Sequence, residues 1–137
     1  MRLIVAVLAL GFVFAGLQFT PTAAAGFAPP EPRPMKAEEL KKWIDAGKPV
    51  AIVDAREELD GEIVKGAVQV TDMQLVAWSE KAPKDSPIVF YCTCEHDELA
   101  IDAVVGMENL GFSNTYYLEG GLEAARKAGI PIVKPTA

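Results

Sequence analysis

Short apolar runs alternate along this chain with longer segments of mixed polarity, and the alternation predicts its secondary structure. Four short, mostly apolar runs predict strands, at residues 50–53, 66–70, 88–91 and 114–118. Four segments of mixed polarity predict helices, at residues 37–46, 72–81, 98–110 and 122–128. The run at 88–91, Ile-Val-Phe-Tyr, is apolar throughout and predicts a strand that is buried on both faces.

The segment at 98–110 carries the broadest apolar surface among the predicted helices. Its stripe consists of Leu99, Ala100, Ala103, Val104, Met107 and Leu110. Gly111 follows at the position where a glycine commonly ends a helix. Asp72 stands where it can cap the helix predicted at 72–81.

The order of these elements predicts an α/β fold with a mostly parallel central sheet and helices on both faces. Strands that alternate with helices are joined by right-handed crossovers, which place the helices over the two faces. In such sheets ligands bind beyond the carboxyl ends of the strands. Asp54, Arg56, Cys92 and the pair Glu119–Gly120 follow predicted strands, so we expect them at that edge.

The first 25 residues have the pattern of a secretory signal peptide. Arg2 supplies a basic start, an apolar stretch follows, and three alanines precede Gly26. We predict a signal peptide at 1–25, a proline-rich linker at 26–34 and one folded domain at 35–137. The alternative is a membrane anchor that is retained. After cleavage we expect no stable membrane insertion, and we expect export to the bacterial periplasm.

Composition narrows the class of function. The 137 residues carry 13 basic and 19 acidic side chains, a net charge of −6, which argues against a nucleic-acid partner. Two cysteines are too few for a disulfide-stapled miniprotein or a four-sulfur zinc site. Outside the cytoplasm thiols are easily oxidised, so both cysteines become candidates for chemistry.

Cys92 lies between a buried strand and the start of a helix, which is a favourable place for a thiolate. Loop N–H groups and the helix dipole put partial positive charge beside such a sulfur. Cysteines at helix N-termini have pKa values lowered to roughly 3.5–7.5, and the thiolate is the nucleophile. The candidate active-site loop comprises Thr93, Cys94, Glu95, His96, Asp97 and Glu98. The competing interpretation of Cys92 is a buried structural thiol.

Two further residues of the loop have open roles. Cys94 is a candidate resolving thiol, which would form a disulfide with Cys92, or it has no role. Cys92, Cys94 and His96 alternate, so a soft metal ion is a weak alternative. We expect no metal and no organic cofactor.

Three segments in order resemble the rhodanese family. They are Val53–Ala67, with Asp54 and Arg56 in it, then Ile88–Cys92, then Asn109–Leu122. The resemblance covers about residues 35–133 and implies a single-domain, rhodanese-like sulfurtransferase fold. In that family a cysteine accepts sulfane sulfur as a persulfide and passes it to a thiol or cyanide, and by position that cysteine is Cys92. The resemblance gives Asp54 and Arg56 a supporting, chiefly structural role.

The loop after Cys92 departs from the family pattern. Family members commonly have glycine and arginine there, whereas this chain has Thr93-Cys94-Glu95-His96-Asp97-Glu98. Nearby carboxylates raise the pKa of a thiol and repel anions, and the anion-binding arginine is absent. We therefore expect a neutral or protein-borne sulfur donor and a thiol acceptor in place of thiosulfate.

The leading interpretation is sulfane-sulfur handling through a persulfide on Cys92. One alternative is a rhodanese-like module of reduced activity that binds a protein partner or a metal ion. Another is a thiol–disulfide oxidoreductase that uses Cys92 and Cys94. Uptake of sulfur by Cys92 distinguishes the first from both others.

Overall fold

The computed structural model describes residues 31–135. The predicted signal peptide (1–25) and most of the predicted linker (26–34) lie outside the described residues. Within the part of the chain that the structure describes, no helix is long and apolar enough to span a membrane.

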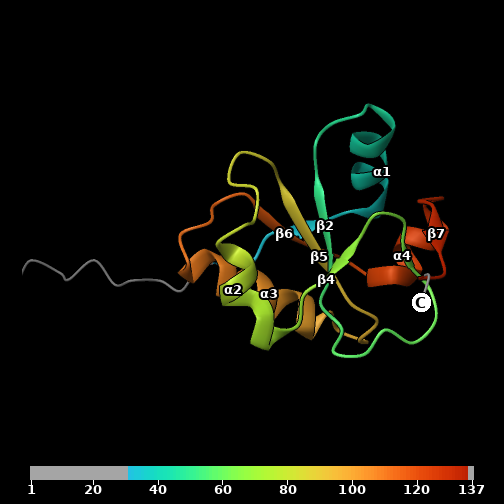
Figure 1. Cartoon of the computed structure of the whole chain (residues 1–137). Helices are drawn as coiled ribbons and strands as arrows, with labels where there is room; N and C mark the ends of the chain where they lie inside the picture. Colours follow the sequence, from blue (N-terminus) through green and yellow to red (C-terminus); the bar gives the residue numbers. More distant parts are fainter. Residues whose placement is uncertain (1–30, 136–137) are drawn as a thin grey trace, which may run out of the picture.

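A five-stranded parallel sheet forms the centre of the fold, in the spatial order β1-β6-β5-β2-β4 (Figure 1). Its strands are β1 (Pro34–Met35), β2 (Ala51–Asp54), β4 (Val68–Gln69), β5 (Ile88–Tyr91) and β6 (Thr115–Leu118). The helices are α1 (Ala37–Asp45), α2 (Leu75–Ser79), α3 (Glu98–Asn109) and α4 (Gly121–Lys127), with a 3₁₀ turn, η1 (Asp72–Gln74), before α2. Strands β3 (Ile63–Val64) and β7 (Ile132–Val133) form a separate antiparallel pair. The predicted α/β fold is confirmed.

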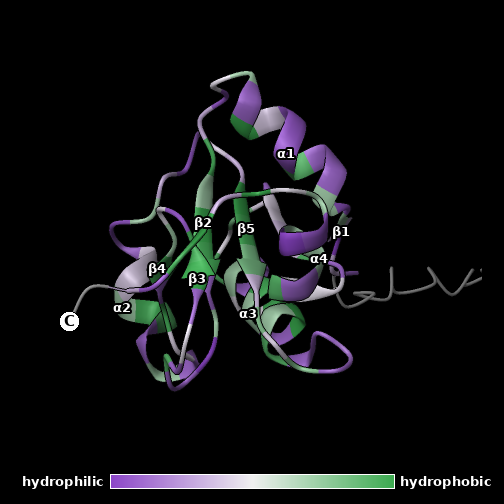
Figure 2. Cartoon of the chain, turned by 90° about the vertical axis from the view of Figure 1, so that its right-hand side faces the viewer, coloured by the Kyte–Doolittle hydropathy of each residue, from purple (hydrophilic) through white to green (hydrophobic). Residues whose placement is uncertain are grey.

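The sheet divides the interior into two apolar clusters. Helices α2 and α3 lie on one face, and α1 and α4 lie on the other (Figure 1). Within β5, Ile88 and Phe90 join the first cluster whereas Val89 and Tyr91 join the second, as the two-residue period of a strand requires. Strands β2 and β5 are the most hydrophobic part of the sheet in Figure 2. The uninterrupted apolar run in β5 is thereby explained, because both of its faces are covered.

Three two-residue strands did not follow from the pattern. Strands β3 and β7 contain too few residues to show a period, and they pair because the chain after α4 returns to the segment that follows β2. Strand β1 includes Pro34, which we had assigned to the linker, and it pairs with β6 at the sheet edge. An edge strand tolerates proline because one side of it needs no backbone donor.

The boundaries of α2 and the stripe of α3 also differ from the predictions. The residue that caps the helical segment is Thr71, whose N–H donates to Oε1 of Gln74 at 3.1 Å, and not Asp72. In α3, Leu99 and Leu110 are 38% and 42% exposed, so the buried face is narrower than predicted. Leu99 lies in the first turn of α3, and Leu110 directly follows its last residue. Gly111 ends α3 as predicted, with a φ of 90°.

The hydroxyl of Tyr91 connects the central sheet to the β3–β7 pair. Tyr91 is 0% exposed, and its oxygen accepts a hydrogen bond from the Val64 N–H at 3.0 Å. Burial is the largest cause that raises the pKa of Tyr91, and the neighbouring Asp54 carboxylate raises it further. The hydroxyl therefore stays protonated in the folded protein at pH values where an exposed tyrosine ionises.

Tyr91→Phe is expected to destabilise the protein by about 1–2 kcal/mol, because the buried Val64 N–H loses its acceptor. The difference should shrink as the pH rises above about 10, where Tyr91 ionises in the unfolded chain but not in the folded one. Urea unfolding between pH 7 and 11 measures both effects. Tyr116→Phe is the control, because Tyr116 is only partly buried. An equal loss at every pH would contradict the proposed effect of burial.

Candidate active site

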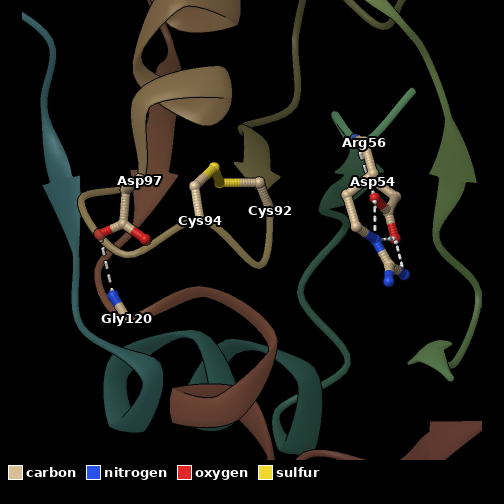
Figure 3. Close-up of a disulfide and its surroundings, with 6 residues drawn as sticks. All are labelled: Asp54, Arg56, Cys92, Cys94, Asp97 and Gly120. Atoms are coloured by element: carbon tan, nitrogen blue, oxygen red, sulfur yellow. Dashed lines mark hydrogen bonds and ion pairs between the residues drawn. A yellow bond between two sulfur atoms is a disulfide. The ribbon is translucent and has the colours of Figure 1, made fainter. Parts of the chain in front are cut away.

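The loop from Cys92 to Asp97 joins the carboxyl end of β5 to the first turn of α3. Cys92 follows the buried strand directly and is itself 0% exposed, whereas Cys94 is partly buried. The two cysteines form a disulfide, with their Cα atoms 5.6 Å apart (Figure 3). In this form neither sulfur is a thiolate, so a reductant or an attacking thiol must open the bond before Cys92 acts as a nucleophile.

The start of α4 holds the Cys92 backbone in place. The carbonyl oxygen of Cys92 accepts a hydrogen bond from the Leu122 N–H at 3.1 Å. Gly121 packs so closely that a Cβ at this position would collide with the same carbonyl oxygen. Gly121 also has a φ of 55°, a conformation that other residues adopt only at a cost. The contact therefore requires glycine both for space and for backbone geometry.

Asp97 connects the far end of the loop to the same turn. Its Oδ2 accepts a hydrogen bond from the Gly120 N–H at 3.0 Å, and its side chain points toward Gly120 in Figure 3. Asp97 has a φ of 57°, a conformation that aspartate tolerates better than most residues. The loop is thus attached at two points, through Cys92 to the first turn of α4 and through Asp97 to Gly120 just before it.

The other loop residues face solvent. Thr93, Glu95, His96 and Glu98 are exposed, so the carboxylates of Glu95 and Glu98 are largely screened from the sulfurs by water. Within residues 31–135, no group of three or more His, Cys, Asp and Glu side chains is arranged to hold a metal ion. Cys92, Cys94 and His96 therefore do not form such a group in this structure.

Asp54 and Arg56 form a buried ion pair at the end of β2. Their side chains are 1% and 8% exposed, and Nη2 of Arg56 lies 2.7 Å from Oδ2 of Asp54 (Figure 3). Nη2 also donates to the carbonyl oxygen of Glu62 at 2.9 Å. The hydrogen bond with Asp54 is the largest cause that raises the pKa of Arg56, so the guanidinium is a permanent cation. These contacts hold the chain between β2 and β3, and none of them involves a cysteine.

A surface pocket of about 380 Å³ lies between the cysteine loop and α4. Its lining residues are Thr93, Cys94, Gly120, Leu122, Glu123 and Arg126. Cys92 does not line it. A second hollow of about 310 Å³ contains three carboxylates, those of Glu57, Asp72 and Asp102, but neither cysteine. Of the two cysteines, only Cys94 therefore lines the first pocket.

Arg126 is the cation of this pocket. Its guanidinium is 44% exposed and lies 2.8 Å from a carboxylate oxygen of Glu62 and 3.4 Å from one of Glu123. The hydrogen bond with Glu62 is the largest cause that raises the pKa of Arg126, so the side chain is charged at all ordinary pH values. The cysteine loop itself contains neither arginine nor lysine, so the positive charge comes from a different element.

The sequence pattern located the loop but missed these partners. Cys92, Asp54 and Arg56 were expected at the carboxyl edge, and the structure places them at the ends of β5 and β2. The sequence placed Gly120 at the same edge, but Gly121 is typical only of a turn there, and Arg126 carries no signal at all. A charged residue on a short helix is most often a solvated side chain, and only its proximity to Cys94 distinguishes this one.

Most of the described residues match known proteins. A family model for the rhodanese-like domain matches residues 36–128. The chain is similar to Probable adenylyltransferase/sulfurtransferase MoeZ from Mycobacterium tuberculosis, at 30% identity over 93 residues, which cover 65% of this chain and 23% of that protein. It therefore spans less than a quarter of that relative's length.

Two shorter proteins match over most of their length. Thiosulfate sulfurtransferase GlpE from Vibrio cholerae is 30% identical over 87 residues, which cover 62% of this chain and 80% of that protein. The solution structure of a rhodanese-like domain from Anabaena has a TM-score of 0.63 and 30% identity, and the match covers 76% of this chain and 80% of that one.

Proposed function

Because the chain belongs to the rhodanese-like domain family, we propose that it transfers sulfane sulfur through a persulfide on Cys92. The observation that carries the proposal is the position of Cys92 at the end of the central strand β5, directly before the loop that leads to α3. Relatives named as sulfurtransferases support the same class of chemistry. Asp54 and Arg56 act as structural supports of the neighbouring strand end.

The proposed reaction has two half-steps, which begin once the disulfide is open. The Cys92 thiolate attacks the outer sulfur of a persulfide R–S–SH, so that a Cys92 persulfide forms and RS⁻ leaves. An acceptor thiolate then attacks the outer sulfur of the Cys92 persulfide and leaves as a new persulfide, while Cys92 becomes a thiolate again. No electrons are gained or lost overall. The donor is a small-molecule or protein-borne persulfide and not thiosulfate, because the loop has no arginine to hold that dianion.

Reduced protein is expected to gain the mass of one sulfur atom when it is incubated with glutathione persulfide. The gain should persist in Cys94→Ser and disappear in Cys92→Ser, because only Cys92 receives the sulfur. Intact mass spectrometry measures the gain, and cold cyanide should remove it as thiocyanate. Thiosulfate is expected to load the protein at least about tenfold less, since no loop arginine binds it.

A protein that gains no sulfur from either donor contradicts the proposal and favours the binding module. Sulfur on Cys94→Ser and on Cys92→Ser in equal amounts would also contradict it, since Cys92 would then have no special role.

A thiol–disulfide oxidoreductase is the second candidate, and the disulfide between Cys92 and Cys94 is the observation that favours it. It predicts that the reduced protein loses two hydrogens in the same experiment without retaining sulfur. The two functions therefore differ by the presence or absence of the added sulfur mass.

We also propose that the protein is exported and that it acts in the bacterial periplasm. Oxidising compartments outside the cytoplasm are where disulfides form and persist. When the full chain is expressed in a bacterium, the intact mass of the protein from the periplasmic fraction should correspond to a first residue of Gly26. A mass that includes residues 1–25 would contradict cleavage.

A further inference from the structure

We propose that Arg126 binds the carboxylate of a small thiol or persulfide, and that this molecule reacts at Cys94. The pocket between the cysteine loop and α4 is then the entry site of the candidate active site. The physiological meaning of this entry site rests on the proposed sulfur transfer. The binding itself does not, because thiol exchange with the disulfide can be measured alone.

Access distinguishes the two sulfurs. An attacking sulfur must approach its target closely, and Cys92 is 0% exposed. Cys94 is partly buried and lines the 380 Å³ pocket. That volume is within the range of roughly 300–1,000 Å³ that small-molecule pockets occupy. We therefore place the first attack, which opens the disulfide, at Cys94.

The exchange step is complete without any further reactant. The thiolate of the small molecule attacks Sγ of Cys94, and a new S–S bond joins the two. The bond between Cys94 and Cys92 breaks, and its electron pair stays on Sγ of Cys92 as a thiolate. The step thus releases the cysteine that the proposed function requires.

The charges of the pocket determine which thiols it favours. Arg126 lines the pocket beside Cys94, and a guanidinium has five N–H donors in a planar fork that matches a carboxylate. Its present partners, Glu62 and Glu123, are 38% and 63% exposed. Ion pairs with such exposed groups are weak, so a ligand carboxylate can share or replace them. Glu123 also lines the pocket and complements an ammonium group, as in amino-acid-type thiols.

The test measures how fast two thiols open the disulfide in the full chain. The thiols are 3-mercaptopropionate, which has a carboxylate, and 2-mercaptoethanol, which is neutral. Arg126→Gln is expected to slow opening by 3-mercaptopropionate about fivefold and to leave 2-mercaptoethanol unchanged. Each thiol is compared only with itself across the variants, so its own reactivity cancels. Trapping with iodoacetamide and intact mass spectrometry count the opened molecules.

The controls distinguish a specific contact with Arg126 from a general effect of positive charge on α4. Lys127→Gln removes a neighbouring charge of the same helix that does not line the pocket, and both rates should stay at the wild-type value. Arg126→Lys should retain part of the preference, because the charge remains. Arg126 is on the surface, so these variants are expected to fold.

An equal loss for both thiols in Arg126→Gln, or a loss of the same size in Lys127→Gln, would overturn the inference. So would unchanged rates in Arg126→Gln. None of these outcomes depends on whether Cys92 later carries sulfur, which the loading experiment decides separately.

Discussion

Gly121→Ala is expected to destabilise the protein by about 3 kcal/mol or more, one of the largest effects of any single methyl group in this fold. Gly121 has a φ of 55°, which alone costs an alanine about 1–2 kcal/mol. The added Cβ would also collide with the carbonyl oxygen of Cys92, which is backbone and cannot rotate away. The start of α4 must therefore withdraw from the loop, and the Leu122 N–H loses its contact with Cys92.

Gly47→Ala distinguishes the cost of a positive φ from the cost of the collision with the Cys92 carbonyl oxygen. Gly47 has a φ of 67°, and a Cβ there meets no atom within 4 Å. Urea unfolding of the oxidised protein should therefore show a loss of about 1 kcal/mol for Gly47→Ala. Hydrogen exchange should show faster exchange of the Leu122 amide in Gly121→Ala only. Equal losses in the two variants would mean that the approach to Cys92 contributes nothing.

Arg56→Met is expected to cost about 3–5 kcal/mol, because it leaves the Asp54 carboxylate buried without its counter-ion. Asp54 is 1% exposed, and the guanidinium contacts both of its oxygens, at 2.7 and 2.9 Å. The same guanidinium holds the carbonyl oxygen of Glu62. Thermal and urea unfolding measure the loss.

Two comparison variants identify the cause. Arg126→Met removes an arginine that also contacts two carboxylates but is 44% exposed, so its cost should stay below about 1 kcal/mol. Asp54→Leu combined with Arg56→Met removes both charges, and this double variant should be more stable than Arg56→Met alone. A double variant that is less stable than the single one would show that the unpaired carboxylate is not the main cost. If Arg56→Met does not fold, a folded double variant still supports the interpretation.

Together these contacts describe a loop whose two ends are attached to the rest of the fold and whose middle faces solvent. Cys92 and Asp97 are held by the residues before and at the start of α4, whereas Thr93, Glu95 and His96 are exposed. Such an arrangement holds Cys92 in position and leaves Cys94 partly exposed. It explains why changes in α4 are expected to affect chemistry at the cysteines.

The amino-acid sequence was enough to predict the elements whose residues carry a local signal. The apolar run of β5 requires burial on both faces, and the alternation of strands with helices requires a parallel sheet. From that topology alone, Cys92, Asp54 and Arg56 were placed at one edge. The end of α3 at Gly111 followed for the same reason, because the conformation that glycine permits is a property of the residue itself.

Three features depend on how distant parts of the chain pack together. They are the pairing of β3 with β7, the close approach of Gly121 to Cys92, and the place of Arg126 in the pocket that Cys94 also lines. Each of these contacts joins residues that are far apart in the sequence. The hydrophobic pattern around one residue carries no information about its partner. The exposed fractions of Cys92 and Cys94 differ for the same reason. Two cysteines separated by one residue look equivalent in a sequence, but the packing of β5 buries one sulfur and leaves the other within reach of solvent.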